Sequence, residues 1–441
     1  MVLHIKGGRK LKGEIKLSAA KNSILPILAA CIMTKHTVVL KNCAPLLDVL
    51  SMIELLKSLG ANVLFLDNDI VINCDRVQPL AVDAGLTKTI RSSIFILGPL
   101  LSRFKQARIS PPGGCEIGLR PIDLHLKGLE NLGVKITTID ENYLSSEKAG
   151  ADVFDRPHGV ILFFDAKEMQ GTNISLAFPS VGATENLMMS AVLSEGTTLI
   201  NGAAKEPEIV DLANFINSLG GKIFGAGTDS ILIEGVKELT GGEYTPIPDR
   251  IVAGTYLCAV ASCGGRVKID EINAAYIYNL VEILKHAGAD FRFRGGKSYL
   301  TSSVEILSKG NLRGVGDVIT QPYPGFPTDM QPQLIAALCG GKGQSIVAEK
   351  LFESRFRYIN ELKKMGANIA CIGDSAVVCG VGKLNGARVA AEDLRGGAAL
   401  VLAGLKAEGT SIVDEVEHID RGYYKIEDDL KKLGADIVRK Q

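Results

Sequence analysis

One pattern recurs six times along the chain and limits the folds that the chain can adopt. A helical run ends in an apolar residue and a glycine, and a β-type segment follows. The glycines are 68 to 87 residues apart, which is too regular for chance; they are Gly60, Gly133, Gly220, Gly288, Gly366 and Gly434. A glycine directly after a helix readily takes the left-handed conformation that ends it. The sequence therefore predicts six copies of one supersecondary unit.

The first copy indicates the order of elements within a unit. Residues 13–17 predict a strand, residues 22–31 a helix and residues 36–40 a second strand. A second helix ends at Gly60, and a hairpin is expected within residues 63–72. This order is βαβαββ. We expect an α/β (α+β) fold with two similar domains, each of three βαβαββ repeats.

The widest spacing, between Gly133 and Gly220, indicates an insertion. The segment Glu147–Gly171 is rich in Asp, Pro and Gly, a composition that suits an extra loop or hairpin.

Composition excludes several classes of function. The 49 basic and 49 acidic residues give zero net charge, which argues against a general nucleic-acid or anionic-membrane surface. No run of about 18 apolar residues occurs, so we expect no membrane insertion. The nine cysteines are scattered without CxxC spacing and are expected to be reduced thiols in a cytoplasmic protein. The six histidines form no zinc-type cluster, so no metal is implied.

A cysteine loop is the first candidate for chemistry. Cys115 lies between Pro111 and Pro121 among three glycines, and Arg120 follows five residues later. Pro121 fits the first turn of a helix that begins the amphipathic run 122–132. A thiol beside a guanidinium and a helix start is expected to be reactive. The alternative is a small residue in an ordinary glycine-rich turn.

The six βαβαββ units and the cysteine loop together resemble the enolpyruvyl transferase family. The likeness runs from Leu11 to Ile437. Its motifs, in chain order, are Ala20-Lys21-Asn22, Gly113-Gly114-Cys115 with Arg120-Pro121, Pro179–Asn186, Glu206–Asp211, Pro248-Asp249-Arg250, Phe326–Gln331, Phe352–Phe356, Asp393-Leu394-Arg395 and His418–Tyr423. The resemblance implies an inside-out α/β barrel in each of two domains that close over the substrates. One domain would be residues 22–248, and the other residues 1–21 plus 249–441.

The resemblance also implies a reaction. The enolpyruvyl group of phosphoenolpyruvate would move to the 3′-hydroxyl of UDP-N-acetylglucosamine, with release of phosphate through a tetrahedral ketal, at the first committed step of peptidoglycan synthesis. The partners would be these two small molecules, and no cofactor is implied. Such a reaction requires an acid, a base and cations that hold a phosphate and a carboxylate.

Residues at the family's motif positions would carry these roles. The catalytic set is Cys115, Asp329, Lys21, Arg395 and Arg421. Asp329 would be the base, although a helix N-cap is its alternative. Cys115 would act on phosphoenolpyruvate and be the thiol that fosfomycin alkylates. The phosphoenolpyruvate ligands would be Lys21, Asn22, Arg120, Arg355, Asp393, Arg395 and Arg421. The UDP-sugar contacts would be Asn22, Arg91, Arg120, Pro121, Ile122, Asp123, Leu124, Ser180, Val181, Gly182, Asp329, Leu351 and Phe352.

Some residues depart from the family pattern; they are Ala19, Glu116, Leu119 and Tyr323. They keep open a paralogue that acts on another UDP-sugar, and a non-catalytic UDP-sugar-binding protein is a further alternative. A 5-enolpyruvylshikimate-3-phosphate synthase is disfavoured, because that enzyme has no Gly-Gly-Cys loop and has Asp-Lys-Ser in place of Ala20-Lys21-Asn22.

Overall fold

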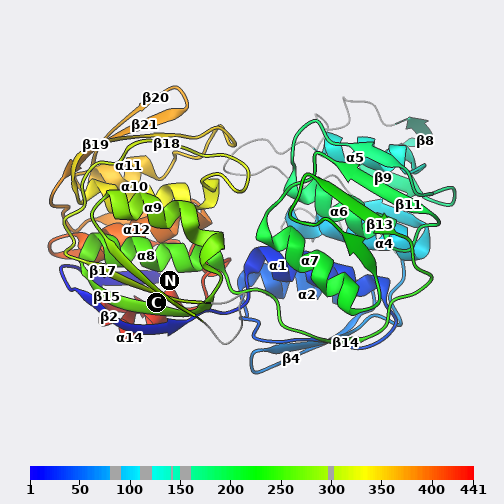
Figure 1. Cartoon of the computed structure of the whole chain (residues 1–441), viewed down its shortest axis with the longest axis horizontal. Coiled ribbons are helices and arrows are strands. Elements are labelled where there is room, and N and C mark those ends of the chain that lie inside the picture. Colours follow the sequence, from blue (N-terminus) through cyan, green and yellow to red (C-terminus); the bar gives the residue numbers. More distant parts are fainter. Residues whose placement is uncertain (80–90, 110–121, 141–142, 149–159, 296–301) are drawn as a thin grey trace. The chain divides into compact units, whose positions relative to one another are not determined.

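The computed structural model describes residues 1–79, 91–109, 122–140, 143–148, 160–295 and 302–441. For residues 91–93, 139–140, 143–148 and 160 it describes the backbone. The chain forms two compact units (Figure 1). Unit 1 consists of Met1–Ser18 and Pro248–Gln441, and unit 2 consists of the described residues between Ala19 and Ile247. The predicted domain boundaries at residues 21/22 and 248/249 stay predictions; the compact units divide at Ser18/Ala19 and at Ile247/Pro248.

Unit 1 has its helices on the inside and its sheets on the outside (Figure 1). Three central helices contact one another and are buried along most of their length; they are α8 (Arg250–Cys263), α10 (Gln331–Cys339) and α12 (Leu394–Lys406). The second helix of each repeat in unit 1 is shorter and has one polar face; these helices are α9 (Tyr278–His286), α11 (Ile359–Lys364) and α14 (Ile426–Lys432). The burial of the central helices on all sides explains why they are rich in Ala, Leu and Val.

The described part of unit 1 contains three four-stranded sheets with one topology. The first has the order β16 (Asp290–Gly295), β17 (Ser302–Ser308), β15 (Gly265–Ile272), β2 (Leu11–Lys16). The second has the order β18 (Gly316–Ile319), β19 (Lys342–Ala348), β21 (Ser375–Val381), β20 (Asn368–Ile372). The third has the order β22 (Arg388–Ala390), β23 (Thr410–Asp414), β1 (Val2–Lys6), β24 (Asp436–Lys440).

Unit 2 repeats this plan. Its most deeply buried helices are α1 (Lys21–Ala30), α4 (Leu97–Phe104) and α6 (Val181–Ala191). The second helices are α2 (Leu47–Ser58), α5 (Asp123–Asn131) and α7 (Pro207–Ser218). Its first sheet has the order β14 (Gly242–Tyr244), β3 (Val38–Leu40), β5 (Asp69–Asn73), β4 (Asn62–Leu66). Its second sheet has the order β6 (Gln106–Ile109), β9 (Val160–Asp165), β7 (Lys135–Asp140), β8 (Tyr143–Lys148). Its third sheet has the order β10 (Asn173–Ser175), β11 (Thr197–Asn201), β13 (Ser230–Glu234), β12 (Lys222–Phe224). One apolar core holds these elements together.

The six repeat glycines end six helices as predicted. Their φ angles lie between 86° and 104°, the left-handed region. The N–H of each glycine donates to the carbonyl three residues before it, and the next N–H donates to the carbonyl five residues before itself. These two hydrogen bonds define the Schellman motif. The prediction of six copies of one unit is confirmed at every one of these caps.

The strand predicted at residues 13–17 exists as β2 (Leu11–Lys16), but it does not belong to the first repeat, where the sequence placed it. β2 pairs in parallel with β15 of unit 1. The strand that pairs in parallel with β3 is β14, which follows β3 by about 200 residues in the chain. Strand pairing depends on where the chain brings a strand, and a local pattern of apolar residues does not contain that information.

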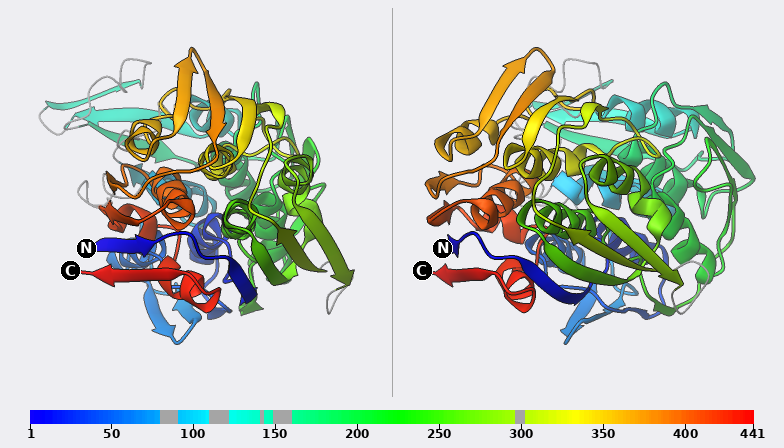
Figure 2. Two further views of the ribbon diagram at one scale, coloured as in Figure 1. Left: turned by 90° about the vertical axis from the view of Figure 1, so that its left-hand side faces the viewer. Right: turned by 60° about the vertical axis from the view of Figure 1, so that its left-hand side comes forward.

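The sixth repeat is completed by the N-terminus of the chain. After the cap at Gly434 only β24 follows, and the hairpin lacks its second strand. β1 takes that place and pairs antiparallel with both β23 and β24. The two ends of the chain therefore lie side by side, as Figure 2 shows.

The insertion begins earlier than the sequence indicated. β7 pairs with β8 on one side and with β9 on the other. Because β7 and β9 correspond to the hairpin strands of the other repeats, β8 is the extra strand, and it starts at Tyr143. Residues 149–159 of the expected insertion lie outside the described residues. The rest, from Val160 onward, belongs to the regular repeat.

Candidate active site

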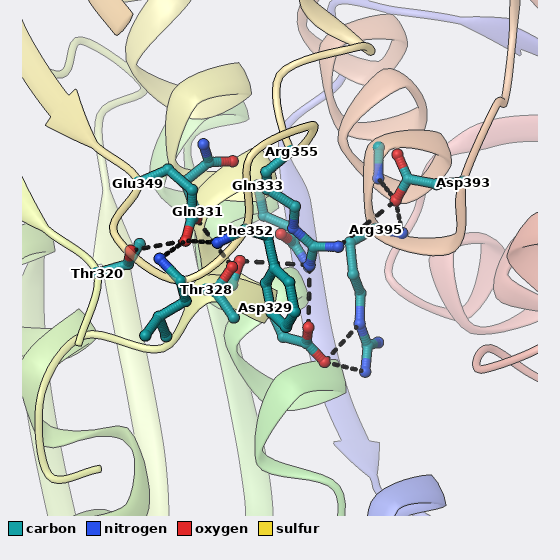
Figure 3. A network of polar contacts seen from close by, with 12 residues as sticks. Thr320, Thr328, Asp329, Gln331, Gln333, Glu349, Phe352, Arg355, Asp393 and Arg395 are labelled. Atoms are coloured by element: carbon teal, nitrogen blue, oxygen red, sulfur yellow. Dashed lines mark hydrogen bonds and ion pairs between the residues drawn. The ribbon is translucent and has the colours of Figure 1, made fainter. Parts of the chain in front are cut away.

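Two arginines converge on one carboxylate in unit 1, and Figure 3 shows this arginine–aspartate cluster (Asp329, Arg355, Arg395). Arg355 Nη2 donates to Asp329 Oδ1 at 2.9 Å. Arg395 donates through Nε and Nη2 to Asp329 Oδ2 at 3.2 and 3.1 Å. Both carboxylate oxygens are thus bound by guanidinium groups. Such charge-assisted pairs are among the stronger hydrogen bonds in proteins.

Three elements position the members of the arginine–aspartate cluster. Asp329 lies in a 3₁₀ turn, Thr328–Met330, directly before α10, so it is not the N-cap residue of that helix, which is Met330. Arg395 lies in the first turn of α12. Arg355 lies in the connection between β19 and α11. The long sequence separations explain why no short window of sequence contains this site.

Asp393 caps the N-terminus of α12, the helix that carries Arg395. It is the N-cap residue, and its Oδ1 accepts hydrogen bonds from the backbone N–H groups of Arg395 and Gly396, each at 3.0 Å. The same oxygen lies 3.9 Å from Arg355 Nη1. Asp393 therefore contacts one arginine through charge and orients the other through the helix cap.

The arginines of the cluster are buried while the carboxylate is partly open. The side chains of Arg355 and Arg395 are 3% and 2% exposed, against 27% for Asp329. Arg355 Nε and Arg395 Nη1 are buried and have no hydrogen-bond partner in the described part of the protein. Burial by itself would lower the pKa of Arg395, but Tyr423 and the nearby carboxylates of Asp329 and Asp249 outweigh it and raise the pKa. The cluster thus keeps unused donors beside a partly accessible carboxylate.

A buried polar layer supports Arg395. Its guanidinium lies over the ring of Tyr423, 5.5 Å from the ring centroid. The Tyr423 hydroxyl hydrogen-bonds Thr255 of α8 at 2.8 Å and accepts from Gln333 of α10 at 3.2 Å. Because these partners come from the central helices, the packing of unit 1 itself orients Arg395.

The other two cations of the predicted catalytic set that the structure describes, Lys21 and Arg421, are paired and half-buried, respectively. Lys21 begins α1, and its ammonium lies 3.2 Å from Asp48 Oδ2, with Asn22 next to it in the same turn. Arg421 is the C-cap residue of the short helix α13 (Glu417–Asp420) and is half-buried.

Two helix N-termini of unit 2 hold predicted UDP-sugar contacts. Ile122, Asp123 and Leu124 lie at the start of α5, and Ser180, Val181 and Gly182 lie at the start of α6. The two helices contact each other. Gly182 lies against the imidazole of His125, where an added Cβ would come within 3.3 Å of the ring. The structure therefore brings together these two triplets, and helix N-termini favour anionic groups.

Leu351 and Phe352 lie at the beginning of the connection that follows β19. Their backbone N–H groups donate to Glu349 Oε1 at 2.9 and 3.3 Å. The connection also carries Arg355, so predicted UDP-sugar contacts and a predicted phosphoenolpyruvate ligand belong to one segment.

Other predicted residues are not placed. Cys115, Arg120 and Pro121 lie outside the described residues, as do Glu116 and Leu119. Arg91 begins the 3₁₀ segment Arg91–Ile96, of which the backbone is described at that position. The predicted roles of these residues stay predictions.

Sequence reasoning missed the side chains that hold the site together. Glu349 is 4% exposed and accepts several hydrogen bonds around the segment before Asp329. His125 and Asn186 form a buried pair beneath Gly182. Glu349 lies two residues before Leu351, and Asn186 ends one of the motifs, so proximity to motifs was the available signal.

The described ranges also bear on metal binding and on membrane insertion. No group of three His, Cys, Asp or Glu residues there could hold a metal ion. No helix in the same ranges combines the length and apolarity that a bilayer-crossing segment needs. The eight cysteines that the structure places are free of disulfide bonds.

Comparison with known sequences identifies relatives along almost the whole chain. The pattern of the family described as EPSP synthase (3-phosphoshikimate 1-carboxyvinyltransferase) matches residues 5–430. UDP-N-acetylglucosamine 1-carboxyvinyltransferase 2 of Caldanaerobacter subterraneus subsp. tengcongensis is 49% identical over 99% of this chain and 98% of its own. UDP-N-acetylglucosamine 1-carboxyvinyltransferase of Coxiella burnetii is 44% identical over 99% of this chain and 95% of its own.

Solved structures share the fold. The enolpyruvyl transferase NikO from Streptomyces tendae matches with a TM-score of 0.83 and 23% identity, covering 99% of this chain and 98% of its own. EPSP synthase from Acinetobacter baumannii matches with a TM-score of 0.75 and 17% identity over the full length of both chains. At these identities the likeness establishes the fold, and the expected inside-out α/β architecture with two similar units is confirmed.

Proposed function

This chain belongs to the UDP-N-acetylglucosamine 1-carboxyvinyltransferase family, and we propose that it transfers the enolpyruvyl group of phosphoenolpyruvate to the 3′-hydroxyl of UDP-N-acetylglucosamine. The sugar oxygen would add to C2 of phosphoenolpyruvate while C3 gains a proton, which gives a tetrahedral ketal. Loss of phosphate from C2 and of a proton from C3 would then restore the double bond.

The arginine–aspartate cluster carries this proposal. It combines a carboxylate able to accept the proton of a hydroxyl with two guanidinium groups able to hold a carboxylate or phosphate. The guanidinium groups are buried, so their interaction with a bound anion is weakened little by water. A base next to fixed anion ligands is what addition of a hydroxyl to phosphoenolpyruvate needs.

Asp329 would be the base, and its contacts suggest how it is released for this role. Both of its oxygens accept hydrogen bonds from Arg355 and Arg395. Oxygens that accept these hydrogen bonds have fewer lone pairs left for a substrate hydroxyl. The carboxylate of phosphoenolpyruvate would compete for the same donors. We infer that binding of phosphoenolpyruvate frees Asp329 to accept the proton of the sugar hydroxyl.

Unit 2 would supply most of the other binding groups, and Arg421 would come from unit 1. The N-termini of α5 and α6 would hold the diphosphate and the nucleotide, with Arg91 and Arg120 adding positive charge. Lys21 and Asn22 at the start of α1 would bind the phosphate of phosphoenolpyruvate with Arg120 and Arg421. Cys115 would act on phosphoenolpyruvate, either as the proton donor to C3 or in product release.

In the cell the product would enter peptidoglycan synthesis, so we propose a role in cell-wall biogenesis, cell shape and cell division in the cytoplasm. The proposed substrates are both small molecules, and neither nucleic acid nor a membrane is a proposed partner. The reaction moves no electrons to an external acceptor, so the residues above need no cofactor or metal to balance it.

A direct assay tests the proposed function. The protein is incubated with phosphoenolpyruvate and UDP-N-acetylglucosamine, and phosphate release is followed while mass spectrometry identifies the nucleotide product. We expect one phosphate for each enolpyruvyl-UDP-N-acetylglucosamine formed. Turnover only with another UDP-sugar would indicate a paralogue of different specificity. Binding of UDP-sugar without any phosphate release would contradict the enzymatic proposal.

Fosfomycin provides a test that reports on Cys115. The drug is a phosphonate epoxide, and the cations proposed to bind phosphate would hold it next to the thiol. We expect time-dependent inactivation with a single adduct on Cys115, faster when UDP-N-acetylglucosamine is present. The matched variant Cys115→Asp should stay active and escape the drug. An adduct on another cysteine would contradict the assignment of Cys115.

A further inference from the structure

Glu349 is a buried carboxylate at the end of β19 whose two oxygens are both engaged. Its Oε1 accepts hydrogen bonds from Thr320 Oγ1 and from the backbone N–H of Leu351, each at 2.9 Å, and from that of Phe352 at 3.3 Å. Its Oε2 accepts from Thr328 Oγ1 at 2.8 Å. Four donors from three separate segments therefore meet at one side chain.

The chemistry of these donors explains why a carboxylate stands at this position. A buried carboxylate is costly unless it is fully hydrogen-bonded, and Glu349 is 4% exposed. Backbone N–H groups can only donate, so the atom that faces Leu351 and Phe352 must be an oxygen. The atom that faces Thr328 could be replaced by an amide N–H₂, because a hydroxyl can also accept.

Thr328 connects Glu349 to the proposed base. It precedes Asp329 in the 3₁₀ turn Thr328–Met330. Its hydroxyl is held by Glu349, and its carbonyl accepts from Arg355 Nη2 at 3.3 Å. Figure 3 shows Thr328 between Glu349 on one side and the arginine–aspartate cluster on the other. The residue next to the base is thus fixed from two directions.

The same carboxylate also fixes the segment predicted to contact the UDP-sugar. It accepts from the N–H groups of Leu351 and Phe352, which turn the chain away from β19. Thr320 adds a second link, because its hydroxyl donates to Glu349 and accepts from the backbone N–H of Lys350 at 2.9 Å. The position of this segment relative to Thr328 therefore depends on one side chain.

We propose that Glu349 is a positioning residue that sets the distance between the base Asp329 and the sugar-binding segment Leu351–Phe352. This inference rests on the proposed function and adds a residue that the family resemblance does not assign a role. Glu349 does not touch the substrates; it acts through Thr328 on one side and through two backbone N–H groups on the other. Misplacement of a catalytic group by about 1 Å can reduce a rate about 100-fold.

The test uses variants that break one link at a time. Thr328→Val removes the hydroxyl that binds Glu349 Oε2 and keeps the shape of the side chain, and Thr328→Ser restores a hydroxyl. Glu349→Gln keeps one oxygen for the backbone N–H groups, whereas Glu349→Ala removes every link. The matched control is Glu361→Gln in the same unit, because Glu361 is also buried and accepts from the backbone N–H of Ala390 at 3.0 Å.

Steady-state kinetics with phosphoenolpyruvate and UDP-N-acetylglucosamine are measured together with the melting temperature. We expect Glu349→Ala to lower kcat about 100-fold and to raise KM for the UDP-sugar. Thr328→Val should lower kcat about tenfold with little change in KM, and Thr328→Ser should recover most of the loss. Glu361→Gln should lower the melting temperature without changing kcat or KM.

The outcomes separate this inference from the proposed function. If the parent enzyme is active but Thr328→Val and Glu349→Ala keep the kcat and KM of the parent, as Glu361→Gln is expected to, the positioning role is wrong and the function stands. If Glu349→Ala does not fold, the kcat values of Thr328→Val and Thr328→Ser still test the positioning role. A parent enzyme that releases no phosphate overturns the proposed function and this inference with it.

Discussion

At the scale of single residues, Asp329 is paired with two buried arginines, and we expect this pairing to determine how the site responds to substrate. The Asp329 carboxylate accepts hydrogen bonds from the guanidinium groups of Arg355 and Arg395, which we propose would bind a substrate anion. Each arginine also keeps one buried nitrogen without a partner among the described residues. A bound carboxylate would satisfy such groups, and an unsatisfied buried donor costs about 1 to 3 kcal/mol. Substrate binding and release of the base are therefore expected to be coupled.

The first prediction concerns Arg395. We expect Arg395→Ala to lower kcat/KM for phosphoenolpyruvate by a factor of about 100 or more, because a donor to developing negative charge contributes about 3 kcal/mol. Arg421→Ala is expected to have a loss of similar size. Circular dichroism should show that both variants are folded. Near-normal turnover by a folded variant would remove that arginine from the active site.

A second residue-scale feature is the buried pair of His125 and Asn186. Asn186 Oδ1 accepts from the backbone N–H of Gly98, and its Nδ2 donates to the carbonyl of Ile94 at 2.9 Å. The same Nδ2 lies 3.0 Å from His125 Nδ1, which must then be the acceptor. Desolvation lowers the pKa of His125 to about 4, against a small opposing effect of Asp123. The imidazole is therefore neutral at physiological pH.

The second prediction follows from this pKa. The native state binds a proton on His125 less readily than the unfolded state, so the contribution of His125 to stability is lost as pH falls from about 6.5 to 4. Between pH 7 and about pH 5 the loss should be about 2 kcal/mol. Urea denaturation of the parent and of His125→Gln, whose amide oxygen can still accept from Asn186, isolates this effect.

Other groups titrate over the same pH range. The quantity compared is therefore the difference in the free energy of unfolding between the parent and His125→Gln at each pH. Burial raises the pKa of Asp211 to about 6, and its contribution runs in the opposite direction, since stability is lost as pH rises through that value. Asp211 is present in both proteins and cancels. Parallel pH profiles for the parent and the variant would contradict a neutral buried His125.

At the scale of elements, the cap of each second helix organises the connection to the next strand. In all six repeats the carbonyl of the residue before the cap glycine accepts a hydrogen bond from the chain returning after the hairpin. In the third repeat this bond joins Thr240 to Leu219, and in the sixth it joins Lys12 to Leu433. The caps therefore end the helices and also fix where the following chain passes.

The third prediction separates backbone strain from crowding at these caps. Gly220 has a φ of +98°, and an added Cβ would meet nothing within 4 Å, so Gly220→Ala should cost about 1 to 2 kcal/mol from strain alone. At Gly60 an added Cβ would lie 2.7 Å from the carbonyl oxygen of Arg76, so Gly60→Ala should cost more. Urea midpoints of both variants provide the measurement.

The matched control for both variants is Gly242→Ala in β14. Its φ is not positive, and the nearest atom to an added Cβ is 3.6 Å away, so we expect a change within about 0.5 kcal/mol. Equal stability of Gly220→Ala and Gly242→Ala would mean that the left-handed conformation at Gly220 carries no cost.

At the scale of the whole molecule, the repeats are completed by strands that are remote in sequence. β14 completes the first repeat, β2 completes the fourth and β1 completes the sixth. In the third sheet of unit 1, β1 lies between β23 and β24 and is a central strand. The beginning of the chain is therefore an internal part of unit 1, although it belongs to the last repeat.

The fourth prediction is that the chain can be circularly permuted. Val2 and Lys440 are direct partners in the antiparallel β1–β24 pair, so replacing Gln441 and Met1 by Asn-Gly should form a two-residue hairpin turn. New ends can be opened between Thr228 and Asp229, which are exposed in the turn between β12 and β13. We expect a folded protein with the parent's circular dichroism spectrum and turnover.

The matched control for the permutant is the unpermuted chain without residues 1–6. In this truncated chain unit 1 lacks a central strand, and β23 and β24 have no common partner. We therefore expect that its unit 1 does not fold. A permutant that is insoluble while the truncated chain folds would mean that β1 does not complete the sixth repeat.

The sequence alone determined the features that depend on short windows of chain. The six cap glycines, the βαβαββ order and the α/β class follow from local conformation and from the period of apolar residues. Motif positions predicted Asp329, Arg355, Asp393 and Arg395, and the structure places these four side chains around one site. Each of these predictions needed only residues near one another in sequence or a match to a known motif.

Only the tertiary structure decided which segments meet. The partners of β2, β14 and β1 lie about 200 to 430 residues away, and a strand's own pattern does not specify its neighbour. The donors around Glu349 come from three segments, and the binding of Asp329 by two arginines depends on the packing of α10 and α12. Long-range pairing and buried hydrogen bonds are properties of the packed chain, and for that reason they could be established only from the fold.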